Sequence, residues 1–226
     1  MFAYHSALAE WRVVRARVVR TRLGLWLLAL AVAALALPGT TEADGLARVG
    51  LLAAALVVAF GAGSDADRAA LPLALTHPTT PAAVAAGRAL AGVAVADAVV
   101  LTVVAGHVWR HGWLDPHLAR SAVAGMAAAA AGAGCALAVA WTFGNVLVGA
   151  LVAYFALLSA VPPDGLAALF GPHPLVTMGS ALVWVLPGTW RAAPLAAGEP
   201  GAWLHALAWA VGGTALAALR LRRRIQ

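Results

Sequence analysis

Three histidines and one aspartate occur close together in a polar stretch of an otherwise apolar sequence. His107 and His111 are four residues apart, and Asp115 and His117 follow in the same stretch. Two histidines at this spacing lie on one face of a helix and could bind a metal ion. Tryptophans two residues to either side of His111 are typical of the aromatic belt at a membrane surface. We therefore interpret the stretch as a solvated interfacial loop, with metal binding as the alternative.

Asp97 is the second residue whose position suggests chemistry, because it stands near the middle of an apolar stretch. A carboxyl group at that depth is unfavourable unless it faces a polar cavity, the interior of a helix bundle or a partner. Asp97, together with Thr102, could line a transport pathway. Alternatively, a protonated Asp97 could form a hydrogen bond at a contact between helices, and the sequence leaves both possibilities open.

The sequence offers no catalytic or nucleotide-binding machinery, so we do not expect an enzyme. No Ser/His/Asp or paired-carboxylate arrangement stands out, and we assign no catalytic residue, cofactor site or metal site to this chain. The sequence contains no Lys, which the phosphate-binding loop of an ATPase requires. Its single cysteine, Cys135, excludes a disulfide framework. Any ATP-driven work would need a separate polypeptide that binds ATP and Mg.

The elements that must hold these residues are predicted to be membrane-spanning helices. Of the 226 residues, 63% are hydrophobic and 11% are charged, which is too apolar for a soluble domain. We predict an all-α, polytopic membrane protein with one transmembrane domain and the lipid bilayer as its main solvent. The six predicted spans cover approximately residues 23–38, 46–63, 89–106, 120–140, 144–161 and 203–219.

The segments between the spans differ in character. Residues 4–20 are predicted to form an interfacial amphipathic helix that includes Trp11, Arg12 and Arg15, whose long side chain can reach the headgroups. For the first span, a cleaved signal peptide is the alternative, which the long basic region before it and the further spans after it disfavour. Residues 64–87 form a Pro-containing inner loop, and residues 162–202 form an outer connector.

The distribution of charge predicts the orientation. All fifteen basic residues are Arg, and most of them flank the first and last spans, where they suit anionic headgroups rather than a nucleic acid. With the N-terminus in the cytoplasm, eleven Arg lie inside and four lie outside. The positive-inside rule therefore predicts a multi-pass protein of the plasma membrane with both termini in the cytoplasm.

Small residues recur within the predicted spans and indicate close packing of helices. They are Gly125, Ala129, Gly132 and Gly134 in the fourth span, and Gly212 and Gly213 in the sixth. The pattern does not say whether the neighbouring helix belongs to the same chain.

The inner loop contains signals for a further helix. Pro78 and Pro81 interrupt any helix that passes through the loop, and Thr79 and Thr80 offer capping hydroxyls. These residues predict a short helix that runs from Pro81 to about Gly87.

The order of these parts resembles the permease subunit of a type-two ABC exporter. The local sequence that carries the resemblance is a leucine-rich stretch, a proline, a short polar turn and a Gly-Arg pair that enters the third span, LPLALTHPTTPAAVAAGRALA from Leu71. The resemblance implies six spans, an inner coupling helix that docks on separate ABC ATPase subunits, and a second permease chain of the same or a homologous sequence. It also implies re-entrant outer segments at residues 166–170 and 176–186.

By this resemblance, the segment that couples to the ATPase contains Thr76, His77, Pro78, Thr79, Thr80, Pro81, Ala82, Ala83, Ala86, Gly87 and Arg88. The expected function is export of a hydrophobic or amphipathic substrate across the plasma membrane. The size also resembles the haem-exporter B subunit of cytochrome c maturation. An alternative of another class is a membrane assembly factor or a structural subunit of a larger membrane complex.

Overall fold

The computed structural model describes residues 9, 12–14, 16, 18, 22–62, 80–113 and 115–225. Regular secondary structure within these ranges is helical throughout, which confirms the predicted all-α class. Four helical segments of the described chain are long and apolar enough to span a membrane: Ala43–Phe60, Pro81–His111, Pro116–Phe143 and Pro200–Arg223.

A helix occurs at each of the six predicted spans. The first five are α2 (Leu23–Ala36), α3 (Ala43–Val57) with its π-helical extension η1 (Val58–Ala62), α5 (Pro81–His111), α6 (Pro116–Phe143) and α7 (Asn145–Leu157). The last is a continuous helical segment made of α11 (Pro200–Leu207), the π-helical η4 (Ala208–Gly213) and α12 (Thr214–Ile225). Helices α2 and α7 have only 14 and 13 residues, whereas a span needs about 20. The number six therefore stays a prediction.

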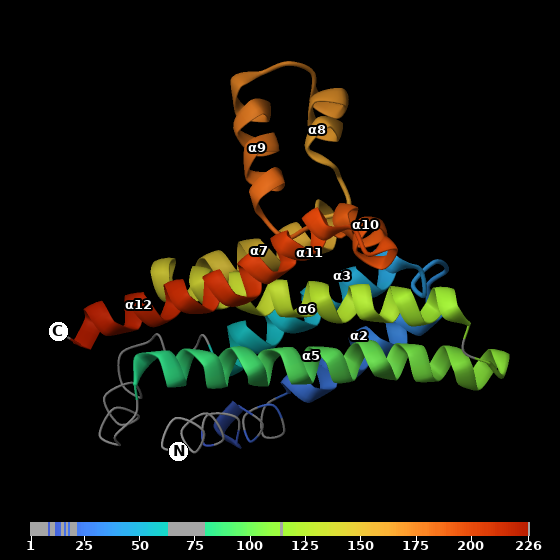
Figure 1. Cartoon of the computed structure of the whole chain (residues 1–226), viewed down its shortest axis with the longest axis horizontal. Coiled ribbons are helices and arrows are strands. Elements are labelled where there is room, and N and C mark those ends of the chain that lie inside the picture. The colour runs from blue at the N-terminus through green and yellow to red at the C-terminus, as the bar shows by residue number, and fades with distance from the viewer. Residues whose placement is uncertain are drawn as a thin grey trace.

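The centre of the protein is the packing of α3 along α6. Helix α5 lies against both of them, α2 packs on α5 and α3, and α12 packs on α5 and α6. Successive long helices run in opposite directions along the long axis, so that the start of α5 and the end of α12 lie at the same end (Figure 1). We call this the inner end and the opposite one the outer end.

Helices α3 and α6 approach so closely that their backbones touch. A Cβ atom on Gly50 would lie within van der Waals overlap of the Gly125 carbonyl oxygen, and one on Gly125 would lie 3.1 Å from Leu46. One and two turns further along, Ala129 and Gly132 face the same helix, with Gly132 against Leu51. The small residues of the predicted fourth span therefore pack against a helix of the same chain.

The second close approach joins α6 to η4. A Cβ atom on Gly213 would lie 2.5 Å from the Gly134 carbonyl oxygen, and Gly134 in turn faces the backbone of Trp209. The adjacent Gly212 has no atom of the described residues within 4 Å of the corresponding position. Only one glycine of the pair is therefore required by packing.

Helices α5 and α6 meet at the outer end with well-formed termini. Helix α5 has 31 residues, or about 46 Å at 1.5 Å per residue, so it extends beyond a hydrocarbon core of about 30 Å. It ends at Gly112, whose φ of 79° is left-handed. Helix α6 begins with Asp115 as its N-cap and Pro116 in its first turn.

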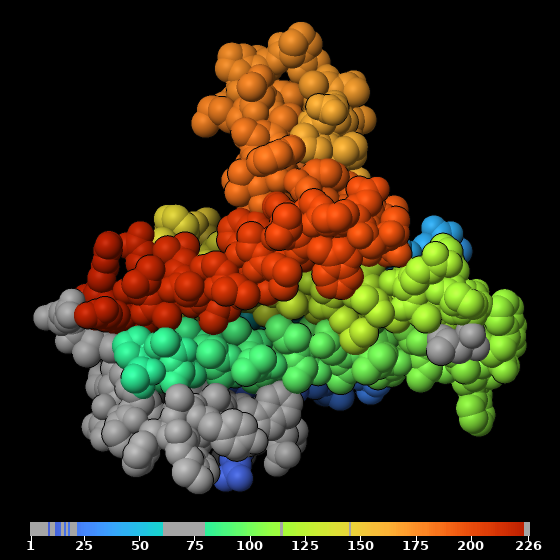
Figure 2. All heavy atoms as spheres, viewed as in Figure 1, coloured from blue at the N-terminus to red at the C-terminus, as the bar shows by residue number. Residues whose placement is uncertain are grey.

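The predicted outer segments form a helical hairpin. Helix α8 (Pro163–Phe170) and α9 (Pro174–Val185) pack on each other, with Gly179 facing the buried Leu166. The Ser180 hydroxyl donates a hydrogen bond to the Pro163 carbonyl oxygen at 2.8 Å. The hairpin stands clear of the helical body (Figures 1 and 2). Short elements return the chain to the body, namely η3 (Thr189–Arg191), a 3₁₀ turn, and α10 (Ala192–Ala197).

The two neighbouring glycines of η4 give a matched test of this packing. Gly213→Ala should lower the free energy of unfolding by about 1–3 kcal/mol, because the added methyl group forces η4 away from the α6 backbone. Gly212→Ala should be neutral or stabilising by up to about 1 kcal/mol, because its methyl group meets open space and alanine favours the helix. Thermal unfolding of both purified variants in the same detergent measures the difference. Equal stability of the two variants would contradict the close contact.

Candidate functional site

The inner end of α5 begins as the sequence predicts. The Thr80 hydroxyl oxygen accepts a hydrogen bond from the Ala83 backbone N–H at 3.2 Å, and Pro81 occupies the first helical position. Thr76, His77, Pro78 and Thr79 lie outside the described residues. The predicted helix start is therefore confirmed, while the rest of the coupling segment stays a prediction.

The predicted end of this helix near Gly87 is wrong. Helix α5 continues without interruption to His111, so the inner segment is the first two turns of a long helix and not a separate knob. One glycine inside a helix costs only about 1 kcal/mol. Burial of the apolar face that follows Gly87 outweighs this cost, because Ala89, Ala91 and Gly92 all pack inward.

The coupling residues within α5 differ in their access to a partner. Ala82 is exposed and Ala86 is half-buried, whereas Ala83, Gly87 and Arg88 are buried. A protein that docks on this end of α5 would therefore meet Ala82 first. A bulky substitution at Ala83 would disturb the packing of α5 itself.

Arg88 is buried at the contact between α5 and α6. Its guanidinium group lies over the Trp141 ring, 5.6 Å from the ring centroid, and both side chains are only 3% exposed. A desolvated cation–π contact contributes about 2 kcal/mol. The contact joins the start of α5 to the end of α6. Arg88 is one of the predicted coupling residues, whereas Trp141 has no predicted role, because no local pattern links positions so far apart in the chain.

Asp97 and Thr102 lie on different faces of α5. Asp97 is half-buried, and its Oδ1 atom is buried without a hydrogen-bond partner among the described residues. Thr102 is exposed, and its hydroxyl donates to the Ala98 carbonyl oxygen at 2.7 Å. The fold therefore does not combine the two into one polar site, and Asp97 is the one with unused hydrogen-bonding capacity.

The predicted interfacial helix is described in part. Arg12 is exposed and helical, and Val14 is helical and 1% exposed. Val18 packs against the same apolar core as Val14, as the predicted apolar face requires. Trp11 and Arg15 lie outside the described residues.

The histidines near the outer end do not converge on a metal site. The His107 and His111 rings lie with their centroids 4.3 Å apart and their planes tilted by 38°, while Asp115 is engaged as the α6 cap. Hydrogen bonds from the Leu118 and His117 N–H groups lower the pKa of the Asp115 carboxyl, because they favour its charged form. No group of three His, Cys, Asp or Glu side chains suited to a metal ion occurs within the described ranges.

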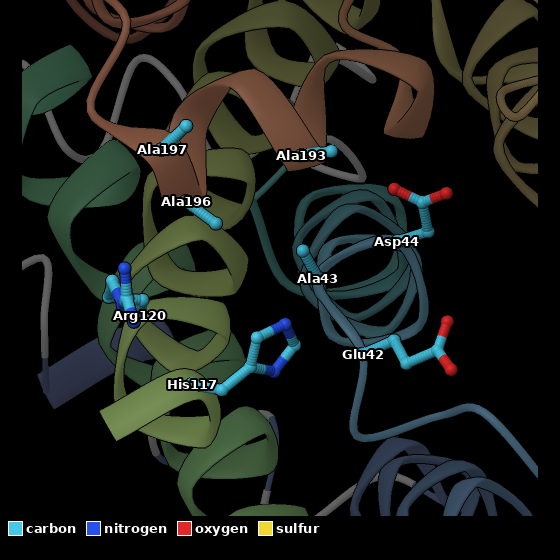
Figure 3. Close-up of a pocket in the computed structure, with 8 residues that line it drawn as sticks. All are labelled: Glu42, Ala43, Asp44, His117, Arg120, Ala193, Ala196 and Ala197. Atoms are coloured by element: carbon cyan, nitrogen blue, oxygen red, sulfur yellow. The ribbon is translucent and has the colours of Figure 1, made fainter. Parts of the chain in front are cut away.

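A cavity of about 430 Å³ opens at the outer end between α3, α6 and α10. Figure 3 shows the His117 ring directed between the helices, whereas the Glu42 and Asp44 carboxylates point away from it. Arg120 folds back, and its Nε donates to the Pro116 carbonyl oxygen at 3.3 Å. The charged groups of this cavity therefore do not face a common point.

The unused oxygen of Asp97 leads to a stability test. Asp97→Asn should leave the free energy of unfolding unchanged or raise it, because a half-buried carboxylate without a partner is unfavourable in the folded protein. Thr102→Val, at an exposed position whose hydroxyl bonds only its own helix, is the matched control and should have little effect. Thermal unfolding in detergent measures the stability of both variants. A marked loss of stability in Asp97→Asn alone would show that the carboxylate makes a structural contact.

Comparisons of the chain with protein-family models, with curated proteins and with solved structures gave no match.

Proposed function

We propose that this chain is the membrane-spanning permease subunit of an ATP-driven exporter that resembles the type-two ABC class. The observation that carries the proposal is the order of elements along the chain. Helices occupy the positions of all six expected spans, and α8 and α9 occur between the fifth and the sixth. The Thr80–Pro81 cap opens the third helix where the coupling segment is expected.

The proposed topology has six spans with both termini in the cytoplasm of a plasma-membrane protein. The alternating directions of the helices support it, because α2 runs toward the outer end, as α5 does, and α7 also runs in this direction, opposite to α6 (Figure 1). Their shortness can be offset by local thinning of the bilayer or by flanking Arg side chains that reach the headgroups. The eleven Arg counted on the inner side favour the same orientation.

The energy source in this proposal is a separate ATPase. A sequence without Lys cannot form the phosphate-binding loop, so ATP and Mg belong to the partner subunits. Ala82, exposed at the inner end of α5, is the residue that we assign to the docking surface. Because α5 is continuous, displacement of its first turn would be carried along the helix into the bundle.

The α8–α9 hairpin supports a membrane setting and a second permease chain. Its apolar side chains are largely exposed, among them Leu169, Phe170, Leu175, Met178, Leu182 and Trp184. An apolar surface of this kind requires lipid or protein to cover it. Re-entry of the hairpin into the bilayer, or contact with a second chain, would each meet this requirement.

Cysteine labelling tests the proposed topology. The single native cysteine, Cys135, is fully buried in α6, so Cys135→Ala provides a clean background. A cysteine placed at the exposed position Glu199, outside the hairpin, should react with a membrane-impermeant maleimide in intact cells. Cysteines at Ala82 and Arg223, which are also exposed, should react only after the cells are opened. Labelling of Arg223→Cys in intact cells would contradict the proposed topology.

Two equivalent helix positions test the docking of the ATPase. Ala82 and Gly201 are both exposed and both follow a proline at the start of a helix, but they lie at opposite ends of the protein. Ala82→Glu should abolish co-purification of ATPase activity by placing a charged, bulky group in the interface. Gly201→Glu should retain it, and both variants should accumulate in the membrane, since an acidic residue suits the first turn of a helix.

The measurement is ATP hydrolysis by the complex purified in mild detergent. Full activity with Ala82→Glu would remove this end of α5 from the mechanism. A stable wild-type protein that never associates with an ATPase would favour the assembly-factor alternative.

A further inference from the structure

Four polar side chains from three separate elements lie in the outer half of the protein with hydrogen-bonding atoms unused. They are Tyr154 of α7, Trp190 and Arg191 of η3, and His205 of α11. Tyr154 Oη, Trp190 Nε1, Arg191 Nε and His205 Nε2 are all buried and have no hydrogen-bond partner within the described part of the chain. Three of these four atoms belong to donor groups, so the cluster is short of acceptors.

Arg191 supplies a positive charge that no described carboxylate neutralises. Its guanidinium lies 4.1 Å from the centroid of the Trp190 ring and 5.7 Å from that of Trp184, and it donates to the Trp184 carbonyl oxygen at 3.3 Å. Arg191 is close enough to both Tyr154 and His205 for its charge to act on them, and no Asp or Glu of the described ranges acts on Arg191. A half-buried cation among aromatic rings is stabilised only in part by those rings.

An apolar cavity of about 280 Å³ adjoins the cluster. Trp184 and His205 line it together with Val185, Ala208, Trp209 and Leu216, which offer mainly hydrocarbon and indole surface. The Trp209 indole N–H donates to the Val185 carbonyl oxygen at 2.6 Å, so this polar group is already satisfied. Trp184 and His205 thus connect a cationic, donor-rich cluster to a space that suits an apolar chain.

We propose that Tyr154, Trp190, Arg191 and the adjoining cavity form a binding site for an anionic amphiphile. A phosphate or carboxylate head would accept hydrogen bonds from the Arg191 Nε–H, the Trp190 indole N–H and the Tyr154 hydroxyl, and would neutralise the guanidinium. Its apolar chain would enter the cavity beside Trp184 and Trp209. This proposal does not depend on the exporter function, because it concerns binding by this chain alone.

Other occupants fit the cluster less well. Water could satisfy the unused donors, but it would leave the charge of Arg191 unpaired. An inorganic anion would pair with the charge but leave the apolar cavity unfilled. A neutral lipid would fill the cavity but provide no negative charge. Only a molecule with both an anionic head and an apolar chain matches both parts of the site.

Binding to the purified full-length chain in a neutral maltoside detergent tests the proposal. The probe is dodecyl phosphate, compared with zwitterionic dodecylphosphocholine and with inorganic phosphate. The readouts are tryptophan fluorescence and the shift in unfolding temperature. Dodecyl phosphate should bind and stabilise the protein, and the other two should bind at least about tenfold more weakly, because each lacks the net charge or the chain.

Three variants locate the site. Arg191→Gln should weaken binding at least about tenfold by removing a charge-assisted hydrogen bond. Arg120→Gln, at an exposed arginine of the outer end outside the cluster, should bind as the wild type does. Tyr154→Phe should weaken binding about two- to tenfold. It should not lower the stability of the unliganded protein, because its hydroxyl has no partner there. This separates loss of binding from loss of folding.

The source of the amphiphile is decided in nanodiscs. If phosphatidylglycerol in a phosphatidylcholine bilayer prevents the binding of dodecyl phosphate, the ligand is a bilayer lipid. If it does not, the ligand is an anionic amphiphile that reaches the site as cargo, and both results support the site. Binding of dodecyl phosphate that is unchanged in Arg191→Gln, or lowered equally in Arg120→Gln, would overturn the proposal.

Discussion

The structure depends on two backbone contacts made by α6. On one side, Gly125 and Gly132 allow the backbone of α3 to pack closely against α6. On the other side, Gly134 packs closely against Gly213 of η4. Within a membrane, lipid chains are as apolar as Leu, so helices associate through close van der Waals contact rather than through exclusion of water. The small residues of α6 make this contact possible. Helices α5 and α12, which both pack on α6, are placed by it in turn.

Because α5 is one continuous helix, a movement at its inner end would be transmitted into the bundle. A short helix that ended near Gly87 would have had a flexible joint between the inner end and the membrane, and a movement could have been lost there. Instead the Thr80 cap, the buried Arg88 and the outer end belong to one helix. The Arg88–Trp141 contact ties its second turn to the end of α6. Under the proposed function, a partner at the inner end would act on α5 and α6 together.

The sequence predicts what is encoded locally. Apolar stretches give the positions of the helices, because a chain in lipid must satisfy its backbone hydrogen bonds within each segment. The Thr80 cap is also visible in a short pattern, whereas the two outer segments are expected from the family resemblance. The Arg88–Trp141 contact and the cluster around Arg191 follow from neither. They join residues on different helices, and neither periodicity nor spacing specifies how two helices are rotated against each other.

The cluster around Arg191 differs from other polar side chains of the helices in how its hydrogen-bonding groups are satisfied. Several hydroxyl groups are satisfied by a carbonyl one turn earlier, as in Thr102 to Ala98, Ser159 to Phe155 and Thr214 to Ala210. This bonding removes the cost of a hydroxyl in an apolar setting. The described Trp indole N–H groups that are bonded reach carbonyls eight or more residues away, as in Trp203 to Leu195 and Trp209 to Val185, so such side chains need a partner elsewhere. Where such groups gather beside an apolar cavity and still have unused donors, the missing acceptor must come from outside the described chain.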